Sequence, residues 1–208
     1  MTVAANSSAQ DGTARLGPGV LLFVVGPSGA GKDTLLRLAK AHFAGSEAVL
    51  FPRRLITRGP DPHEDHDCVD AMVLREAVAN GDVALAWSAH GLDYAVPAAV
   101  DDAVRAGKVV VVNVSRKIVL AAARKYRRVV VAVVTAPAEV LAERLRSRGR
   151  ETIDDVAQRL DRHIGDDLSQ AVETHVVENV GDPSDAAETL VALINGLIGA
   201  VAGGGPSA

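Results

Sequence analysis

A glycine-rich stretch constrains this chain more than any other feature. Residues 26–34 read Gly-Pro-Ser-Gly-Ala-Gly-Lys-Asp-Thr, an apolar run from Val20 to Val25 precedes them, and a helical pattern of leucines follows. A strand, a glycine loop and a helix with the spacing G-x-x-x-x-G-K are typical of a P-loop, where backbone N–H groups and a helix N-terminus surround phosphate oxygens. The sequence therefore predicts nucleotide binding through the phosphates.

The positions of this loop have different predicted tasks. Lys32 is expected to reach the β- and γ-phosphates of ATP. The residue after the lysine is normally Ser or Thr, which binds Mg²⁺, but here it is Asp33, and Thr34 supplies a hydroxyl one place later. Because a carboxylate is a hard oxygen donor, we expect Asp33 to hold Mg²⁺ directly or through water. The predicted ATP-binding residues of the loop are Gly26, Pro27, Ser28, Gly29, Ala30, Gly31, Lys32, Asp33 and Thr34.

Length, charge and cysteine content limit the possible classes of protein. The chain has 208 residues, is 48% hydrophobic and carries a formal charge of −4, with acidic and basic residues interspersed. These values suit one folded domain that binds small anions, and argue against a nucleic-acid or membrane-surface partner. The single cysteine, Cys68, permits no internal disulfide and favours the cytoplasm. We expect flexible tails at 1–17 and 201–208, with neither a secretory signal nor a run of membrane-spanning length.

Apolar runs alternate with helical patterns along the rest of the chain, which predicts an α/β fold with a parallel sheet covered on both faces. The predicted strands are Val49 to Arg58, Val83 to Trp87, Val109 to Val114, Val129 to Val134 and His175 to Glu178. The predicted helices include 71–79, Pro97 to Ala106, Ser115 to Tyr126, one opened by Pro137, one from Thr152 to Val172, and one begun by Asp182-Pro183. Residues 59–67 and 90–94 are expected to be loops. Ligands are expected at the carboxyl ends of the strands.

Arginines are the other candidates for chemistry, because phosphoryl transfer depends on positive charge around the transferred group. The candidates are Arg58, Arg144, Arg148, Arg150, Arg159 and Arg162. We expect the cluster as a whole to contact phosphate, although basic residues at a helix C-terminus also suit an ordinary solvated face. His63 and His66 stand among acidic residues, which suits sugar hydroxyls at least as well as a metal ion.

Taken together, these motifs resemble those of the ribose 1,5-bisphosphate phosphokinase family, a branch of the guanylate-kinase-like P-loop kinases. The matching segments are Gly26 to Leu36, Leu55 to Arg58, Glu64 to His66, Trp87 to Tyr94, Val112 to Arg116 and Arg144 to Glu151. The resemblance implies a three-layer kinase domain over 18–200, with an acceptor-binding insertion at about 55–96 and an arginine-rich lid at about 144–160. It also implies transfer of the ATP γ-phosphoryl group to ribose 1,5-bisphosphate, giving ADP and 5-phosphoribosyl 1-diphosphate in phosphonate degradation. Asp33 after the lysine is itself similar to the family pattern.

The resemblance also assigns roles to individual residues. It implies that Arg144, Arg148 and Arg159 close over the transferring phosphoryl group and that Asn179 contacts adenine. The implied acceptor-binding residues are Arg58, Glu64, His66, His90, Tyr94 and Asn113. The chain departs from the guanylate-kinase pattern at Asp61 and Asp93, and Ala95 stands where family members often have glycine. The departures at Asp61 and Asp93 imply that the acceptor phosphate is held differently from that of a nucleoside monophosphate.

Two other functions stay open from the sequence. A guanylate-type nucleoside monophosphate kinase is the nearest alternative, but Ala86 stands where guanylate kinases have a glutamate that binds guanine, and Asn113 and Ser115 replace two aspartates. A non-catalytic nucleotide-binding module is a second alternative, against which the intact Lys32 and the arginines speak. The oligomeric state, monomer or homodimer, is open.

Overall fold

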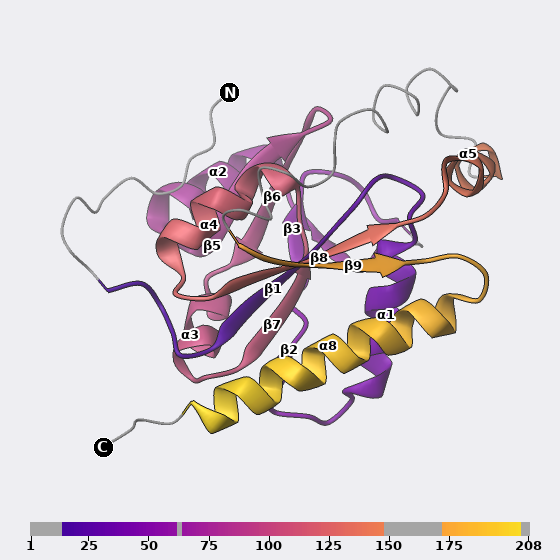
Figure 1. The fold of residues 1–208 in the computed structure, drawn as a ribbon. Helices are drawn as coiled ribbons and strands as arrows, with labels where there is room; N and C mark the ends of the chain where they lie inside the picture. Colours follow the sequence, from indigo (N-terminus) through magenta and orange to yellow (C-terminus); the bar gives the residue numbers. More distant parts are fainter. Residues whose placement is uncertain (1–13, 62–63, 148–171, 205–208) are drawn as a thin grey trace.

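The computed structural model describes residues 14–61, 64–147 and 172–204, and its core is a parallel sheet of five strands in the order β2-β7-β1-β8-β9 (Figure 1). Every neighbouring pair of strands in this sheet runs parallel, as the sequence predicts. The strands are β1 (Val20–Val25), β2 (Val49–Leu50), β7 (Val109–Asn113), β8 (Val129–Thr135) and β9 (Glu173–Glu178). β1 lies at the centre, so the glycine loop that follows it opens at the carboxyl edge of the sheet.

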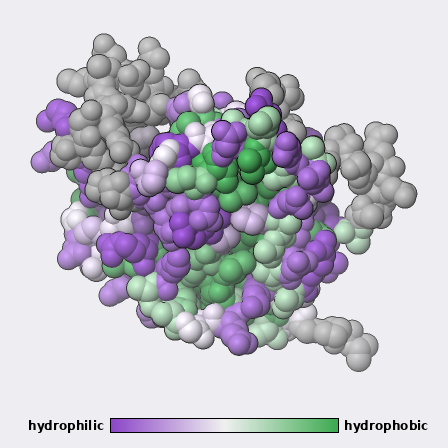
Figure 2. All heavy atoms as spheres, turned by 180° about the vertical axis from the view of Figure 1, so that it is seen from behind, coloured by the Kyte–Doolittle hydropathy of each residue, from purple (hydrophilic) through white to green (hydrophobic). Residues whose placement is uncertain are grey.

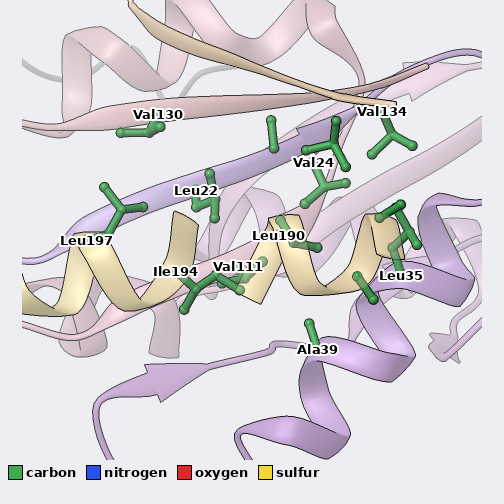
Figure 3. Close-up of a cluster of buried hydrophobic side chains, with 14 of the residues drawn as sticks. Leu22, Val24, Leu35, Ala39, Val111, Val130, Val134, Leu190, Ile194 and Leu197 are labelled. Atoms are coloured by element: carbon green, nitrogen blue, oxygen red, sulfur yellow. The ribbon is translucent and has the colours of Figure 1, made fainter. Parts of the chain in front are cut away.

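Helices cover both faces of this sheet, and that is why its central strands are apolar at every position rather than at alternate ones. On one face α1 (Lys32–His42) and α8 (Pro183–Gly203) pack against Leu22, Val24 and Val111, with Leu35, Leu190 and Ile194 from the helices in the same cluster (Figure 3). On the other face α3 (Ala99–Arg105), the short 3₁₀ helix η1 (Arg116–Ile118) and α4 (Val119–Lys125) enclose a second cluster.

The ends of the domain differ from the sequence prediction. At the N-terminal end, the amide of Leu16 donates to the carbonyl of Lys125 at 2.9 Å, so the chain is already paired with the domain before residue 18. At the other end, α8 continues to Gly203 and is capped at its start by Asp182, which accepts from the Ser184 amide at 2.8 Å.

Helix α8 is also more apolar than the sequence analysis allowed. Among the described residues, it is the one helix long and apolar enough to cross a membrane, with 21 residues and an 18-residue window whose mean hydropathy is 1.6. This finding contradicts the expectation that no such run exists. Length and composition alone are weak evidence for a membrane span, because a core helix has the same properties. Here Leu190, Ile194 and Leu197 of α8 are buried in the core.

A second sheet of four strands, in the order β4-β3-β6-β5, stands beside the core sheet. Its strands are β3 (Arg54–Ile56), β4 (His66–Cys68), β5 (Val83–Ala89) and β6 (Leu92–Pro97), and α2 (Ala71–Asn80) connects β4 to β5. These elements fall within the segment expected to form the acceptor-binding insertion. Strands β5 and β6 form an antiparallel hairpin, while β3 and β4 are parallel.

Four local predictions in this region are wrong. The strand expected over 49–58 is two strands in different sheets, because Pro52 between them has no N–H to continue a ladder. The loop expected at 90–94 is a two-residue turn, in which His90 and Gly91 have φ of 54° and 74°, followed directly by β6. Residues 66–68, expected in a loop, form β4, and the helix expected from Pro97 begins at Ala99.

Helix α5 (Ala138–Ser147) follows β8. Its last residues, 144–147, are the described part of the predicted lid. Residues 148–171 lie outside the described residues, so the helix expected from Thr152 and the predicted roles of Arg148 and Arg159 stay predictions. On the face drawn in Figure 2, hydrophilic and hydrophobic residues are interspersed over the surface.

Candidate active site

The glycine loop adopts a backbone that side chains do not tolerate. Gly26, Gly29 and Gly31 all have positive φ, at 148°, 82° and 86°. A Cβ atom on Gly26 would lie 2.1 Å from the carbonyl oxygen of Val134, and one on Gly31 would lie 2.3 Å from Nδ2 of Asn179. The loop is therefore packed closely against the ends of β8 and β9. Because α1 begins at Lys32, its N-terminus faces the loop, as phosphate binding requires.

Asn179, directly after β9, holds this loop by a hydrogen bond. Its backbone N–H donates to the carbonyl of Thr135 at 2.8 Å, which continues the pairing of β9 with β8, and its Nδ2 donates to the carbonyl of Ala30 at 2.7 Å. The side chain is 1% exposed. The amide nitrogen is turned toward the loop backbone, and the predicted contact of Asn179 with adenine stays a prediction.

Lys32 points back over the loop, and its Nζ donates to the carbonyl of Pro27 at 2.9 Å. Burial lowers the pKa of Lys32 to about 8, while the neighbouring Asp33 carboxylate acts in the opposite direction. Arg54 and Glu64 also influence this pKa, so both lie within electrostatic range of the ammonium group. The arrangement keeps one cationic group at the open side of the loop, where the phosphates of a nucleotide would lie.

Asp33 is held by the neighbouring strand. Nδ2 of Asn113, the last residue of β7, donates to Oδ1 of Asp33 at 3.0 Å. Asn113 is 9% exposed. Among the described residues, no group of three or more His, Cys, Asp and Glu side chains could hold a metal ion alone. A single oriented carboxylate beside a phosphate loop fits Mg²⁺, which is commonly bound through one or two carboxylates together with substrate phosphates.

A cavity of about 600 Å³ opens beside the loop. Its walls are formed by the first turns of α1, the carboxyl end of β7, the segment that leads into β3, and the described residues of the acidic loop, 60–61 and 64–66. Predicted site residues that line it are Asp33, Thr34, Glu64, His66 and Asn113. Lining residues absent from the prediction include Arg37, Lys40, Arg53 and Arg54. The cavity therefore joins the predicted metal and phosphate groups to a set of cations that the sequence analysis missed.

The acidic loop carries the partners of these cations. Arg54, at the start of β3, and Arg58, after its end, both pair with the carboxylate of Glu64. Arg58 also lies 3.4 Å from Asp61. On the outer side, Lys40 and Arg53 both pair with Asp65, at 2.8 and 3.1 Å. Arg58, whose acceptor-binding role stays a prediction, and Arg54, which the sequence analysis did not single out, therefore face the same carboxylate.

The remaining predicted acceptor residues lie in three different environments. His66 is 5% exposed, and its ring nitrogens lie 3.0 and 3.3 Å from the carbonyl oxygens of Glu64 and Gly59, so it braces the acidic loop. Tyr94 stacks on Trp87 with ring centroids 5.2 Å apart, and burial raises the pKa of its hydroxyl. His90 is exposed in the hairpin turn and does not line the described cavity. Its predicted acceptor contact is therefore not supported by its position.

Arg144 brings the last described part of the predicted lid to the loop. Its Nη1 lies 4.0 Å from the position that a Cβ atom on Gly31 would occupy. The guanidinium of α5 therefore approaches the same glycine that Asn179 supports. Of the three lid arginines implied by the resemblance, this is the one that the structure describes.

These features define the class of the protein. A phosphate loop at the carboxyl edge of a parallel sheet, with a lysine, an oriented carboxylate and an arginine from a later helix around it, is the site of a P-loop kinase, a phosphotransferase. Residues 22–165 match the family described as AAA domain. The chain also shares its fold with the guanylate kinase from Anaplasma phagocytophilum, at a TM-score of 0.61 and 19% identity over 88% of this chain and 87% of that one.

Curated relatives give the family. The chain is 49% identical to the ribose 1,5-bisphosphate phosphokinase PhnN of Methylobacterium radiotolerans over 84% of this chain and 97% of the relative. It is 44% identical to the protein of the same name from Bradyrhizobium diazoefficiens, over 89% and 93% of the two chains. The chain therefore belongs to the ribose 1,5-bisphosphate phosphokinase family, as its motifs indicate.

Proposed function

We propose that this protein transfers the γ-phosphoryl group of ATP to the 1-phosphate of ribose 1,5-bisphosphate, producing ADP and 5-phosphoribosyl 1-diphosphate in phosphonate degradation. The observation that carries the proposal is the similarity to the Methylobacterium radiotolerans relative along 97% of its length. The phosphate loop, with Lys32 and Asp33 at its end, supplies the local chemistry.

In this reaction an oxygen of the acceptor's 1-phosphate attacks the γ-phosphorus of ATP. A new P–O bond forms, the bond from the γ-phosphorus to the β,γ-bridging oxygen breaks, and its electron pair leaves with ADP. The protein's task is to hold two anionic groups in line and to stabilise the charge that shifts between them.

Each described residue has a distinct part in this task. Loop amides and Lys32 hold the donor's β- and γ-phosphates, and Arg144 neutralises charge on the transferring group from the side of α5. Arg58 holds the acceptor, with Tyr94 behind it. Asp33, oriented by Asn113, would hold Mg²⁺. When bound, Mg²⁺ would neutralise charge on the phosphate oxygens of ATP. Arg148 and Arg159 complete the lid in this proposal.

The setting of the reaction follows from its substrates. Both are small anions, and the interspersed charges of the chain give no reason to add a nucleic-acid or membrane partner. We place the reaction in the cytoplasm, where ATP is available and a lone cysteine stays reduced. The assembly is a monomer or a homodimer.

The decisive experiment is product identification after mixing the protein, Mg·ATP and ribose 1,5-bisphosphate. We expect ADP and 5-phosphoribosyl 1-diphosphate in equal amounts, and neither product with Lys32→Ala. Because the guanylate kinase fold is shared, GMP is offered as an acceptor in a parallel reaction. Formation of GDP in place of 5-phosphoribosyl 1-diphosphate would show a nucleoside monophosphate kinase, and no ATP turnover with either acceptor would indicate a non-catalytic nucleotide-binding module.

A further inference from the structure

Arg54 is a buried cation at the wall of the cavity, with 7% of its surface exposed. Its Nη2 donates to Oε1 of Glu64, and Nη2 of Arg58 donates to Oε2 of the same carboxylate. One anion therefore bridges two arginines that lie four positions apart in the chain. The side chain of Glu64 is itself only 15% exposed.

The buried ion pairs of Glu64 with Arg54 and Arg58 are weak evidence that these charges stabilise the fold. Removing charges from water costs several kcal/mol per ion, and replacing a buried ion pair by apolar residues often leaves a protein equally stable. The cavity beside Arg54 also contains ample space for a small ligand. In addition, Nε of Arg58 is buried and has no hydrogen-bond partner among the described residues. The group thus retains a hydrogen-bond donor that Glu64 leaves unused.

The position of this group suits an acceptor. Arg54 and Glu64 line the same cavity as Asp33 and Thr34, which directly follow Lys32 of the phosphate loop. A molecule in this cavity would therefore lie between the phosphate loop and Arg54. Arginine binds carboxylates and phosphates with the same planar set of donors, so an anion seated between Arg54 and Arg58 can be either one.

We propose that Arg54 and Arg58 form a clamp for a phosphate group of the acceptor, and that Glu64 occupies the clamp until that phosphate displaces it. This inference rests on the proposed function, because it requires an acceptor rich in phosphate. Ribose 1,5-bisphosphate carries two phosphate groups on a small sugar and needs more cations than an acceptor with one. Arg54 supplies the additional cation, and a dianionic phosphate attracts the pair more strongly than a single carboxylate does.

The test is direct binding of ribose 1,5-bisphosphate, measured by calorimetry without ATP so that no turnover occurs. Arg54→Gln should raise the Kd for this acceptor by about 10-fold or more, the loss expected for a hydrogen bond between charged groups. The Kd for ATP should stay unchanged. A wild-type Kd for the acceptor in folded Arg54→Gln would overturn the clamp.

Arg105→Gln is the matched control. Arg105 ends α3, its guanidinium is half exposed and pairs with Asp102 at 2.8 Å, and it does not line the cavity. This variant should bind ribose 1,5-bisphosphate with the wild-type Kd. An equal loss in both variants would show a general effect of charge and would contradict a role specific to Arg54.

Glu64→Gln decides the question if Arg54→Gln fails to fold. Gln keeps the shape of the side chain but removes the negative charge that competes with phosphate. The Kd for ribose 1,5-bisphosphate should therefore fall, and an unchanged or higher Kd would overturn the proposal. The outcome is separable from the proposed function: absence of 5-phosphoribosyl 1-diphosphate with wild-type protein refutes the function, whereas normal product with unaltered binding in these variants refutes the clamp.

Discussion

Asn113 donates a hydrogen bond from Nδ2 to Oδ1 of Asp33 at 3.0 Å, and so ties the end of β7 to the first turn of α1. In P-loop NTPases a hydroxyl residue after the lysine and an aspartate from another segment hold Mg²⁺ together. Here the helix supplies the carboxylate and the strand supplies an amide. The amide can orient the carboxylate without adding a second negative charge.

We therefore predict that Asn113→Ala weakens Mg²⁺ binding. Loss of a residue that orients a metal ligand typically costs about 10–100-fold in metal affinity or activity. The measurement is Mn²⁺ binding to the protein with ADP, followed by electron paramagnetic resonance, together with the Mg²⁺ dependence of the rate. Asn80→Ala, an exposed asparagine at the end of α2, is the control. Unchanged metal affinity in Asn113→Ala would contradict an orienting role.

Lys32 predicts a dependence of stability on pH. Burial lowers its pKa from 10.5 to about 8, so between these values the folded lysine is neutral while the unfolded one is protonated. The unfolded state then binds more protons, and the contribution of Lys32 to the free energy of unfolding rises with pH in this window. Below pH 8 both states are protonated and the burial penalty is fully present.

The check is urea unfolding of wild type and Lys32→Met between pH 7 and 10.5 without nucleotide. The stability advantage of Lys32→Met should be largest below pH 8 and should shrink above it, by at most about 1.4 kcal/mol per pH unit. A difference that stays constant with pH would contradict the lowered pKa. In catalysis, the same variant should lose turnover because the cation at the phosphates is gone.

Gly31→Ala should abolish ATP binding while leaving the fold intact. Its Cβ atom would meet Nδ2 of Asn179 at 2.3 Å, and its φ of 86° is strained for any other residue. Gly45→Ala is a close control, since Gly45 has φ of 83° but nothing within 4 Å of the added atom. We expect calorimetry to show ATP binding in the control alone. Normal ATP binding in Gly31→Ala would show that the loop and Asn179 can shift to accommodate the added Cβ atom.

Arg144→Lys tests the part of the lid that the structure describes. Lysine keeps the charge but not the planar set of donors, so we expect kcat to fall by about 10²-fold or more, with a smaller change in KM. Arg146→Lys, an exposed position on the same helix, should behave as wild type. Equal kcat in Arg144→Lys and wild type would remove Arg144 from the reaction.

The sequence predicts the core sheet well because each buried parallel strand is marked by its own apolar run. The P-loop is equally local, since nine consecutive residues with their flanks define it. The contacts that join distant segments had no such signal. Asn179 reaches Ala30 across 149 positions and Asn113 reaches Asp33 across 80, so neither partner is visible from spacing.

Arg54 was missed for a related reason. It is the second of two consecutive arginines and begins a short strand, where a solvated side chain is the ordinary expectation, and only the fold of the acidic loop brings Glu64 to it. Strand β4 was missed because its residues, His66 to Cys68, are polar and few. Such edge strands depend on a neighbour's backbone more than on their own composition.

The final prediction is that GMP is a poor acceptor. Seating guanine near β5 requires acceptors for the donors on its ring, and Ala86 offers no side-chain oxygen where guanylate kinases place a glutamate. Unpaired buried donors cost about 1–3 kcal/mol each, roughly tenfold or more in specificity per group. Ribose 1,5-bisphosphate has no base and avoids this cost. The measurement is kcat/KM for both acceptors under the same Mg·ATP conditions, where we expect at least about a tenfold preference for the sugar bisphosphate. A preference for GMP would overturn this prediction and the proposed function with it.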